Sequence, residues 1–182
     1  LFSFTVQAQS LKDYFSNEGT NALYLGIDFT LNKVIDDANA NVTDIRDRQY
    51  NGLNDLVVNE PKKFDLKEAF HRSSDVDHDL GIMNDRNVKS NADAIKSTST
   101  SDFHRLKDAD IQSLVNGIDF KGKKGLGILM VSEAMGKGEK AIAMWVAFVD
   151  MSAKKVLLTD RIEGKVGMGF GFRNYWATGI KN

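Results

Sequence analysis

The stretch from Lys124 to Lys165 constrains the fold more than any other part of the sequence. It contains three apolar, strand-like runs, GLGILMVSEAM, KAIAMWVAFVD and KVLLTDRIEGK, separated by the segments GKGE and MSAK. Apolar runs of this length, bounded by glycine and polar residues, are typical of β-strands joined by tight turns. The pattern predicts a three-strand antiparallel meander. Because its central strands are so apolar, we expect any functional site to lie at the rim of the meander.

The length and composition fit one globular domain. The chain has 182 residues, of which 42% are hydrophobic and 27% charged, and it contains a single proline. A domain of this size buries about 70% of the surface that its unfolded chain exposes, so it needs no disulfide or metal to hold it together. The absence of cysteine excludes thiol catalysis, thiolate metal sites and lipid attachment to a cysteine.

The net charge limits the range of partners. The formal charge is −1 at pH 7, whereas nucleic-acid-binding domains usually carry an excess of basic residues. We therefore expect no nucleic-acid partner. No run approaches the roughly 18 apolar residues that a transmembrane helix needs, so we expect no transmembrane segment either.

Residues 1–9, LFSFTVQAQ, resemble the end of a signal peptide. An apolar remnant is followed by Val6-Gln7-Ala8, which matches the residue pattern before a cleavage site. The alternative is an ordinary N-terminal strand over LFSFTV. The signal-peptide interpretation predicts a periplasmic or secreted protein in which residues 10–182 form a single domain, without a lipid anchor.

The remaining segments predict an α+β (α/β) fold. Its mixed sheet of four to five strands would be covered by helices and would end in the C-terminal meander. We expect helices over 10–16 with Ser10 as N-cap, 42–59, 65–71, 108–116 with Gly117 in the left-handed conformation, and from about Arg173 onward; strands are expected over 21–30, 82–88 and 94–99.

Two acidic features are candidates for polar chemistry. Asp28 stands at the end of the first predicted strand, where a carboxylate is either catalytic or caps the following loop. Asp75, Asp77 and Asp79 alternate, with His78 among them. Oxygen ligands at this density could hold Ca²⁺ or Mg²⁺, although the spacing is not that of an EF-hand. The alternative is a solvated acidic loop.

Glycines cluster in two segments, GKKGLG (122–127) and GKVGMGFG (164–171). A phosphate-binding loop needs a strand, a glycine-rich turn and then a helix. The first segment leads into a strand and fails this test. The second lacks the Lys-Ser/Thr pair of a phosphate loop, so a flexible or bulged loop is the better interpretation.

The C-terminal segment is rich in aromatic and basic residues. Arg173, Asn174, Tyr175 and Trp176 follow Phe170 and Phe172 closely, and tyrosine, tryptophan and arginine are enriched at binding hot spots. The four are candidate binding residues. The alternative is that Phe172 and Trp176, four residues apart on a helix, dock that helix on the sheet.

No catalytic constellation stands out. The three histidines are not accompanied by a nucleophile elbow, so we assign no catalytic residues, no cofactor and no enzymatic activity.

Two stretches resemble an uncharacterised family of secreted proteins from Bacteroidetes-type bacteria. One is NALYLGIDFT with the helix after it and NEPKKFDLKEAF; the other is WVAFVDMSAKKVLLTDRIEGKVGMGFGFRNYWA. The resemblance covers most of the chain from about residue 20 onward, and it implies export without a catalytic activity. At fold level only, the chain is similar to the periplasmic α/β domains of the curli-secretion lipoprotein CsgG and of the N-terminal part of TolB, which carry an Asp at the hairpin turn, here Asp150.

These observations predict a non-enzymatic exported protein that acts in the cell envelope by binding an unknown protein partner or by self-association. The alternative is a protein that binds a small ligand or a divalent metal through the acidic loop 75–79, with or without hydrolytic activity.

Overall fold

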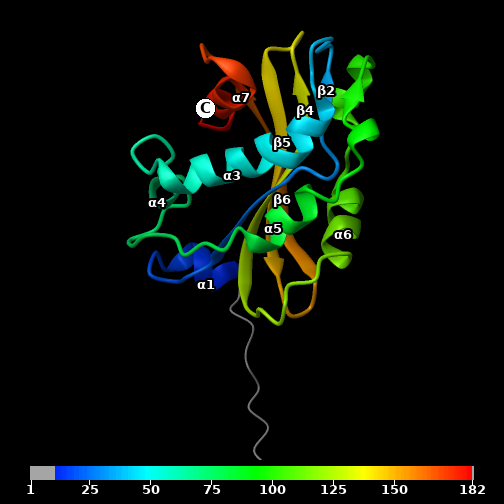
Figure 1. Cartoon of the computed structure of the whole chain (residues 1–182). Helices are drawn as coiled ribbons and strands as arrows, with labels where there is room; N and C mark the ends of the chain where they lie inside the picture. The colour runs from blue at the N-terminus through cyan, green and yellow to red at the C-terminus, as the bar shows by residue number, and fades with distance from the viewer. Residues whose placement is uncertain (1–10, 182) are drawn as a thin grey trace, which may run out of the picture.

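The computed structural model describes residues 11–181 and shows a mixed β-sheet with helices on both faces (Figure 1). The strand order is β3-β2-β4-β5-β6, and β1 also pairs with β4. The strands are β1 (Leu23–Asp28), β2 (Lys33–Ile35), β3 (Lys96–Ser97), β4 (Leu126–Gly136), β5 (Ala141–Asp150) and β6 (Lys155–Lys165). The predicted α+β class is confirmed.

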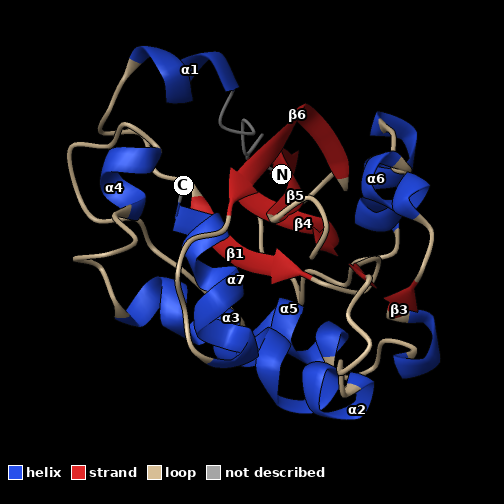
Figure 2. Ribbon diagram, turned by 90° about the horizontal axis from the view of Figure 1, so that it is seen from above, coloured by secondary structure: helices blue, strands red, loops and turns tan. Residues whose placement is uncertain are grey.

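The helices surround this sheet (Figure 2). The α-helices are α1 (Leu11–Ser16), α2 (Val42–Asp44), α3 (Tyr50–Asn59), α4 (Leu66–Ala69), α5 (Gly81–Asn87), α6 (Asp108–Asn116) and α7 (Gly171–Lys181); η1 (Ile45–Gln49) is a π-helical turn, and η2 (Ala92–Ala94) and η3 (Thr100–His104) are 3₁₀ turns. None of the helices in residues 11–181 combines the length and apolar character needed to cross a membrane.

The predicted meander over residues 124–165 is confirmed as β4, β5 and β6. The pairing of β4 with β5 is antiparallel and runs from Leu126 opposite Asp150 to Gly136 opposite Ala141. The pairing of β5 with β6 is also antiparallel. Strands β1, β2 and β3 join the sheet in parallel register, so the sheet is mixed, as predicted.

Strand β1 pairs with β4 on one side and is covered by two asparagine side chains on the other. Asn54 of α3 accepts a hydrogen bond from the Ile27 N–H at 2.7 Å, and Asn87 of α5 accepts one from the Phe29 N–H at 2.8 Å. Both amide groups also donate to the Ile27 carbonyl at 3.1 Å. Because buried backbone groups need partners, these two side chains take the place of a neighbouring strand.

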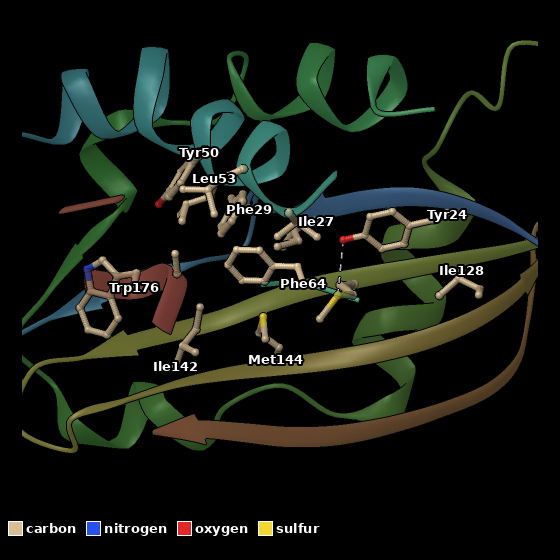
Figure 3. Close-up of a cluster of buried hydrophobic side chains, with 14 of the residues drawn as sticks. Tyr24, Ile27, Phe29, Tyr50, Leu53, Phe64, Ile128, Ile142, Met144 and Trp176 are labelled. Carbon is tan, nitrogen blue, oxygen red and sulfur yellow. Dashed lines mark hydrogen bonds between the residues drawn. The ribbon is translucent and has the colours of Figure 1, made fainter. Parts of the chain in front are cut away.

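Each face of the sheet has its own hydrophobic core. On one face, α3 and α7 pack over residues such as Ile142 and Met144 (Figure 3). On the other face, α5 and α6 pack over residues such as Leu129 and Trp145. Helices at 42–59 and 108–116 were predicted to cover the sheet, and they do so from opposite faces.

A buried charge lies in the apolar meander, where the sequence predicted no polar chemistry. Glu133 has no exposed surface. Its Oε2 accepts hydrogen bonds from Arg161 Nε at 2.8 Å and from Trp145 Nε1 at 3.2 Å, and its Oε1 accepts one from the Leu106 N–H at 2.6 Å. A buried carboxylate needs a partner of opposite charge and further hydrogen bonds, and this network supplies both.

Strand β6 is the last strand on its side of the sheet. Two of its N–H groups are occupied by side chains: that of Val156 donates to Gln112 at 2.9 Å, and that of Arg161 donates to Asp160 at 2.9 Å. Near the end of β6, Gly164 packs against the backbone of Gly179, where an added Cβ would stand 1.7 Å from the Gly179 oxygen.

Two local predictions are wrong. Residues 82–88 were expected to form a strand, but 81–87 form helix α5. The helix buries the adjacent residues Ile82 and Met83 together, whereas a strand would point them to opposite faces. Gly117 has φ −82° and not the expected left-handed conformation. The predicted signal peptide over 1–9 and the Ser10 cap lie outside the described residues.

Candidate functional site

A pocket of about 540 Å³ lies beyond the C-terminal ends of β2 and β4. Ligands of open α/β sheets bind at this end of parallel strands. We call it the loop pocket. It is lined by Asp37, Asn39, Ala40, Asn41, Asp44, Ile45, Lys137, Gly169, Gly171, Phe172, Tyr175 and Trp176.

Strand pairing brings two opposite charges together in this pocket. Ile35, near the end of β2, pairs with Gly136 at the end of β4. The residues that follow, Asp37 and Lys137, therefore meet, and the Lys137 Nζ lies 3.0 Å from the Asp37 carboxylate. Asp37 is only 8% exposed, so its charge is balanced within the protein and the pocket gains little net charge from this pair.

The start of the long helix over 42–59 forms a second wall. Asn41 caps it by accepting a hydrogen bond from the Asp44 N–H at 3.1 Å. The π turn then brings Gln49 within 2.8 Å of the Asp44 carboxylate. This hydrogen bond, helped by Arg48, lowers the pKa of Asp44 below its usual value. Single π turns inside α-helices are frequent at functional sites.

The glycine-rich segment after β6 forms the third wall. Gly169 passes so close to α7 that an added Cβ would lie 2.6 Å from the Asn174 carbonyl oxygen, which explains the glycine. Phe172 and Tyr175 are partly buried on α7. Their rings meet Trp176 edge-on, with centroids 6.2 Å and 5.0 Å apart. The pocket therefore has an aromatic wall opposite its polar one.

Two large apolar side chains project next to this wall. Met168 is 100% exposed and Phe170 is 95% exposed. They alternate with Gly167 and Gly169 in a four-residue segment that we call the 167–170 loop. Exposed apolar side chains are common singly, but two almost fully exposed ones beside a pocket indicate an interaction site.

The structure separates the four predicted binding residues at 173–176. Arg173 and Asn174 are exposed, and Tyr175 is partly buried in the wall of the loop pocket. The Arg173 guanidinium lies over Gly52 of α3, because a Cβ at Gly52 would stand 2.9 Å from its Nη1. Trp176 is 1% exposed and belongs to the core. It docks α7 on the sheet, as the alternative interpretation predicted (Figure 3).

The acidic loop does not form a metal-binding group. Among residues 11–181, no three His, Asp or Glu side chains are placed to share a metal ion. Asp79 forms an ion pair with Lys123 at 2.5 Å and accepts a hydrogen bond from the Gly81 N–H, where α5 begins. The backbone of Asp77 and His78 pairs with Tyr24 of β1. Asp75 is exposed, as a solvated loop predicts.

Asp28 has a structural role. Its Oδ1 accepts hydrogen bonds from the Thr30 N–H at 2.8 Å and from the Thr30 hydroxyl at 2.5 Å, and its Oδ2 accepts one from Arg86 Nε at 2.7 Å. It therefore caps the loop after β1, one of the two roles considered from the sequence.

Sequence reasoning missed Asp37, Asp44, Lys137 and Met168 as residues of the site. Asp37 and Lys137 meet through the pairing of strands about 100 residues apart, which no local pattern reports. Asp44 has only local partners, and the sequence does not show that its helix borders the pocket. Met168 did carry a signal, because an apolar residue between two glycines has little chance of joining a helix or a strand.

No protein family, no characterised protein and no solved structure matches this chain. The resemblances noted from the sequence therefore remain predictions.

Proposed function

We propose that this protein is a non-enzymatic, exported binding protein of the cell envelope that holds a partner protein at the 167–170 loop and the loop pocket. The observation that carries the proposal is the near-complete exposure of Met168 and Phe170 beside a concave, partly aromatic surface. Burial of a phenylalanine side chain removes about 150–250 Å² from water, so a partner that covers this loop is bound through the hydrophobic effect.

The polar groups of the loop pocket favour binding over catalysis. Asp37 is paired with Lys137, and Asp44 is held by Gln49 and Arg48. Because both carboxylates are already bound to neighbouring side chains, their role is to hold the walls of the pocket in place. A general base needs instead a raised pKa and a free path to its substrate, and the pKa of Asp44 is lowered.

The shape of the site favours a protein partner over a membrane surface. A lipid bilayer is flat, whereas the loop stands next to a cavity of about 540 Å³. Such a cavity accepts a protruding side chain, and its neighbours Tyr175 and Arg173 are of the types that dominate binding hot spots. The expectation of export rests on residues 1–9 and on the resemblance of the chain to a family of secreted proteins.

The test is a capture experiment with the purified chain as bait and an envelope extract as source, followed by binding measurements with the purified captured protein. The Met168→Asp/Phe170→Asp double variant is compared with wild type and with Val88→Asp. Val88 is 39% exposed on another part of the surface, so it is the matched control.

We expect one protein that binds wild type and Val88→Asp equally and binds the double variant at least about tenfold more weakly, because two apolar hot-spot side chains are lost. Equal binding to all three baits contradicts the proposed surface. Binding of wild type, but not of the double variant, to protein-free vesicles of envelope lipids would show that the loop enters a membrane, and would overturn the proposal.

A further inference from the structure

A second cavity, which we call the sheet groove, opens on the sheet face that α3 and α7 cover. Its volume is about 550 Å³. Met130 of β4, Val146 of β5 and Ile162 of β6 form its floor. Phe64 and Phe70, which flank α4, line one wall, and Ile180 at the end of α7 lines the other. The groove is thus apolar on its floor and on both walls.

Strand β6 carries two partly exposed apolar side chains on this face, one in the floor of the groove and one beyond it. Ile162 is 39% exposed and Leu158 is 43% exposed. They lie opposite Met144 and Phe148, which both belong to the core of this face. Leu158 and Ile162 therefore point to the same side of the sheet as the groove. Asp160 lies between them on the same side, opposite Val146, and is exposed, so one carboxylate interrupts the apolar surface beyond the groove. Exposed apolar side chains next to an apolar cavity mark a candidate interaction site.

The sheet groove and the 167–170 loop are complementary in chemistry. The loop offers two apolar side chains with almost no cover, and the groove offers an apolar cavity within the roughly 300–1,000 Å³ range of pockets that hold ligands. The rim of the groove carries both signs of charge, Lys62 and Lys181 with Asp65 and Glu68. The positive charge of Arg173, which lies beside the loop, would therefore face a rim of mixed charge.

The two surfaces cannot meet within one chain. The loop ends where α7 begins at Gly171, whereas the groove is lined by Ile180 and Lys181 at the other end of that helix. Helix α7 has 11 residues, which corresponds to a length of about 16 Å at 1.5 Å per residue. The 167–170 loop can therefore reach a sheet groove only on a second copy of the chain.

We propose that the 167–170 loop of one copy inserts Met168 and Phe170 into the sheet groove of a second copy. This inference rests on the proposed function, because it uses the same loop, and it names the partner as another copy of this chain. The contact joins two different surfaces, so it is head-to-tail: copies add one after another unless the rotation closes a ring.

The contact belongs to the weak class of protein interfaces. Two side chains bury far less than the roughly 800 Å² per partner of a standard stable interface. We therefore expect association that grows with concentration from about 10 μM to about 1 mM. It should depend little on salt, because the contact is apolar.

The test uses sedimentation velocity of the full chain over this concentration range, with two variants that each disable one surface. Phe170→Asp disables the loop, because it replaces one of the two inserted apolar side chains with a charge. Ile162→Asp disables the groove, because it places a charge in its apolar floor. Both positions are partly or fully exposed, and circular dichroism checks that both variants fold. Val88→Asp is the control.

Wild type and Val88→Asp should grow beyond dimers, and each disabled variant alone should stay monomeric. An equimolar mixture of the two disabled variants should form a complex of two chains and stop there, because only one pair of working surfaces is present. A mixture that stays monomeric, or Phe170→Asp that associates like wild type, would overturn the inference. Association lost in Ile162→Asp but kept in Phe170→Asp would point to a groove-to-groove contact instead.

The outcomes for the two proposals are separable. If the wild-type chain remains monomeric but binds a captured protein through Phe170, the self-association proposal is wrong and the proposed function stands. If the wild-type chain associates as described, but a captured protein binds wild type and Met168→Asp/Phe170→Asp equally well, the proposed function is wrong and the self-association proposal stands.

Discussion

The Nε atom of Arg161 lies 2.8 Å from the Oε2 atom of Glu133, although their strands are not neighbours in the sheet. The pair joins β4 to β6 across β5. Trp145 of β5 stands directly opposite Arg161 and donates its indole N–H to the same Glu133 oxygen. One buried carboxylate thereby connects all three strands of the meander through side chains, in addition to the backbone hydrogen bonds.

Replacement of this carboxylate should destabilise the protein strongly. Glu133→Gln keeps the shape of the side chain but leaves the largely buried Arg161 without its buried counter-charge, and removal of one partner from a buried ion pair costs about 3 kcal/mol. Glu163→Gln is the control, because Glu163 also pairs with Arg161 but is one-third exposed, and exposed pairs contribute less than about 1 kcal/mol. Urea unfolding measures both values, and equal losses would contradict the structural role of Glu133.

The asparagine cover of β1 predicts a local effect. Asn87→Ala should leave the Phe29 N–H buried without an acceptor, at a loss of about 2 kcal/mol in the free energy of unfolding. Amide hydrogen exchange gives the sharper measurement, because the Phe29 amide should exchange faster than in wild type. Asn116→Ala removes an exposed amide of α6 whose hydrogen-bond partner is Gln112, and it should leave the exchange of the Phe29 amide unchanged. Unchanged protection at Phe29 in Asn87→Ala would show that the side chain does not cover this edge.

The contact between β6 and α7 predicts an asymmetry between two glycines. Gly164→Ala should displace α7, since its Cβ would overlap the Gly179 carbonyl oxygen at 1.7 Å. Overpacking of this kind costs about 1–3 kcal/mol or more. Gly167→Ala meets nothing closer than 3.8 Å and should be almost neutral. Tryptophan fluorescence, to which Trp176 on α7 and Trp145 on β5 both contribute, follows thermal unfolding; an equal melting temperature for both variants would contradict the contact.

The Asp79–Lys123 pair predicts a dependence on pH. The hydrogen bond from Lys123 and the one from the Gly81 N–H lower the pKa of Asp79 in the folded state. A lowered folded pKa gives stability above the unfolded value of about 3.9, and this stability is lost as the pH falls through the folded pKa. Asp79→Asn should therefore lower the free energy of unfolding, measured with urea at pH 7, by less than about 1 kcal/mol because the pair is partly exposed. The difference should diminish as the pH falls below about 3.9 and the folded carboxylate takes up its proton; a difference that does not change with pH would show another cause.

Addition of divalent metals should leave the stability unchanged. A ligand that binds only the folded state raises the free energy of unfolding as its concentration exceeds its Kd. Since Asp79 is held by Lys123 and the other acidic side chains of the loop are not grouped around a common point, Ca²⁺, Mg²⁺, Mn²⁺ and Zn²⁺ should not shift the melting temperature. A shift that disappears in Asp77→Asn would instead support the metal-binding alternative.

The elements that local pattern determines were predictable. Residues 108–116 form α6 as expected, and the three runs of the meander form β4, β5 and β6. Helix α5 was missed because Ile82 and Met83 are a short apolar pair within a polar segment, and periodicity needs a longer run to distinguish a helix from a strand.

The long-range polar contacts were not predictable. Glu133 and Arg161 are separated by 28 residues, and Asn87 and Phe29 by 58. Their pairing depends on strand register and on how helices cross the sheet, which the sequence does not state locally. The same holds for the candidate site. Its glycine-rich wall was visible in the sequence, but the Asp37–Lys137 pair opposite that wall exists only once β2 and β4 are paired.

The outer edge of β6 limits assembly by strand addition. Exposed strand edges are templates on which other chains deposit as fibrils. Here Gln112 and Asp160 already occupy the N–H groups of Val156 and Arg161, so an incoming strand would have to displace both side chains before it could form a continuous ladder. Copies that associate through the 167–170 loop and the sheet groove should thus separate again on dilution. Their contact is made by side chains and adds no strand to the edge of the sheet.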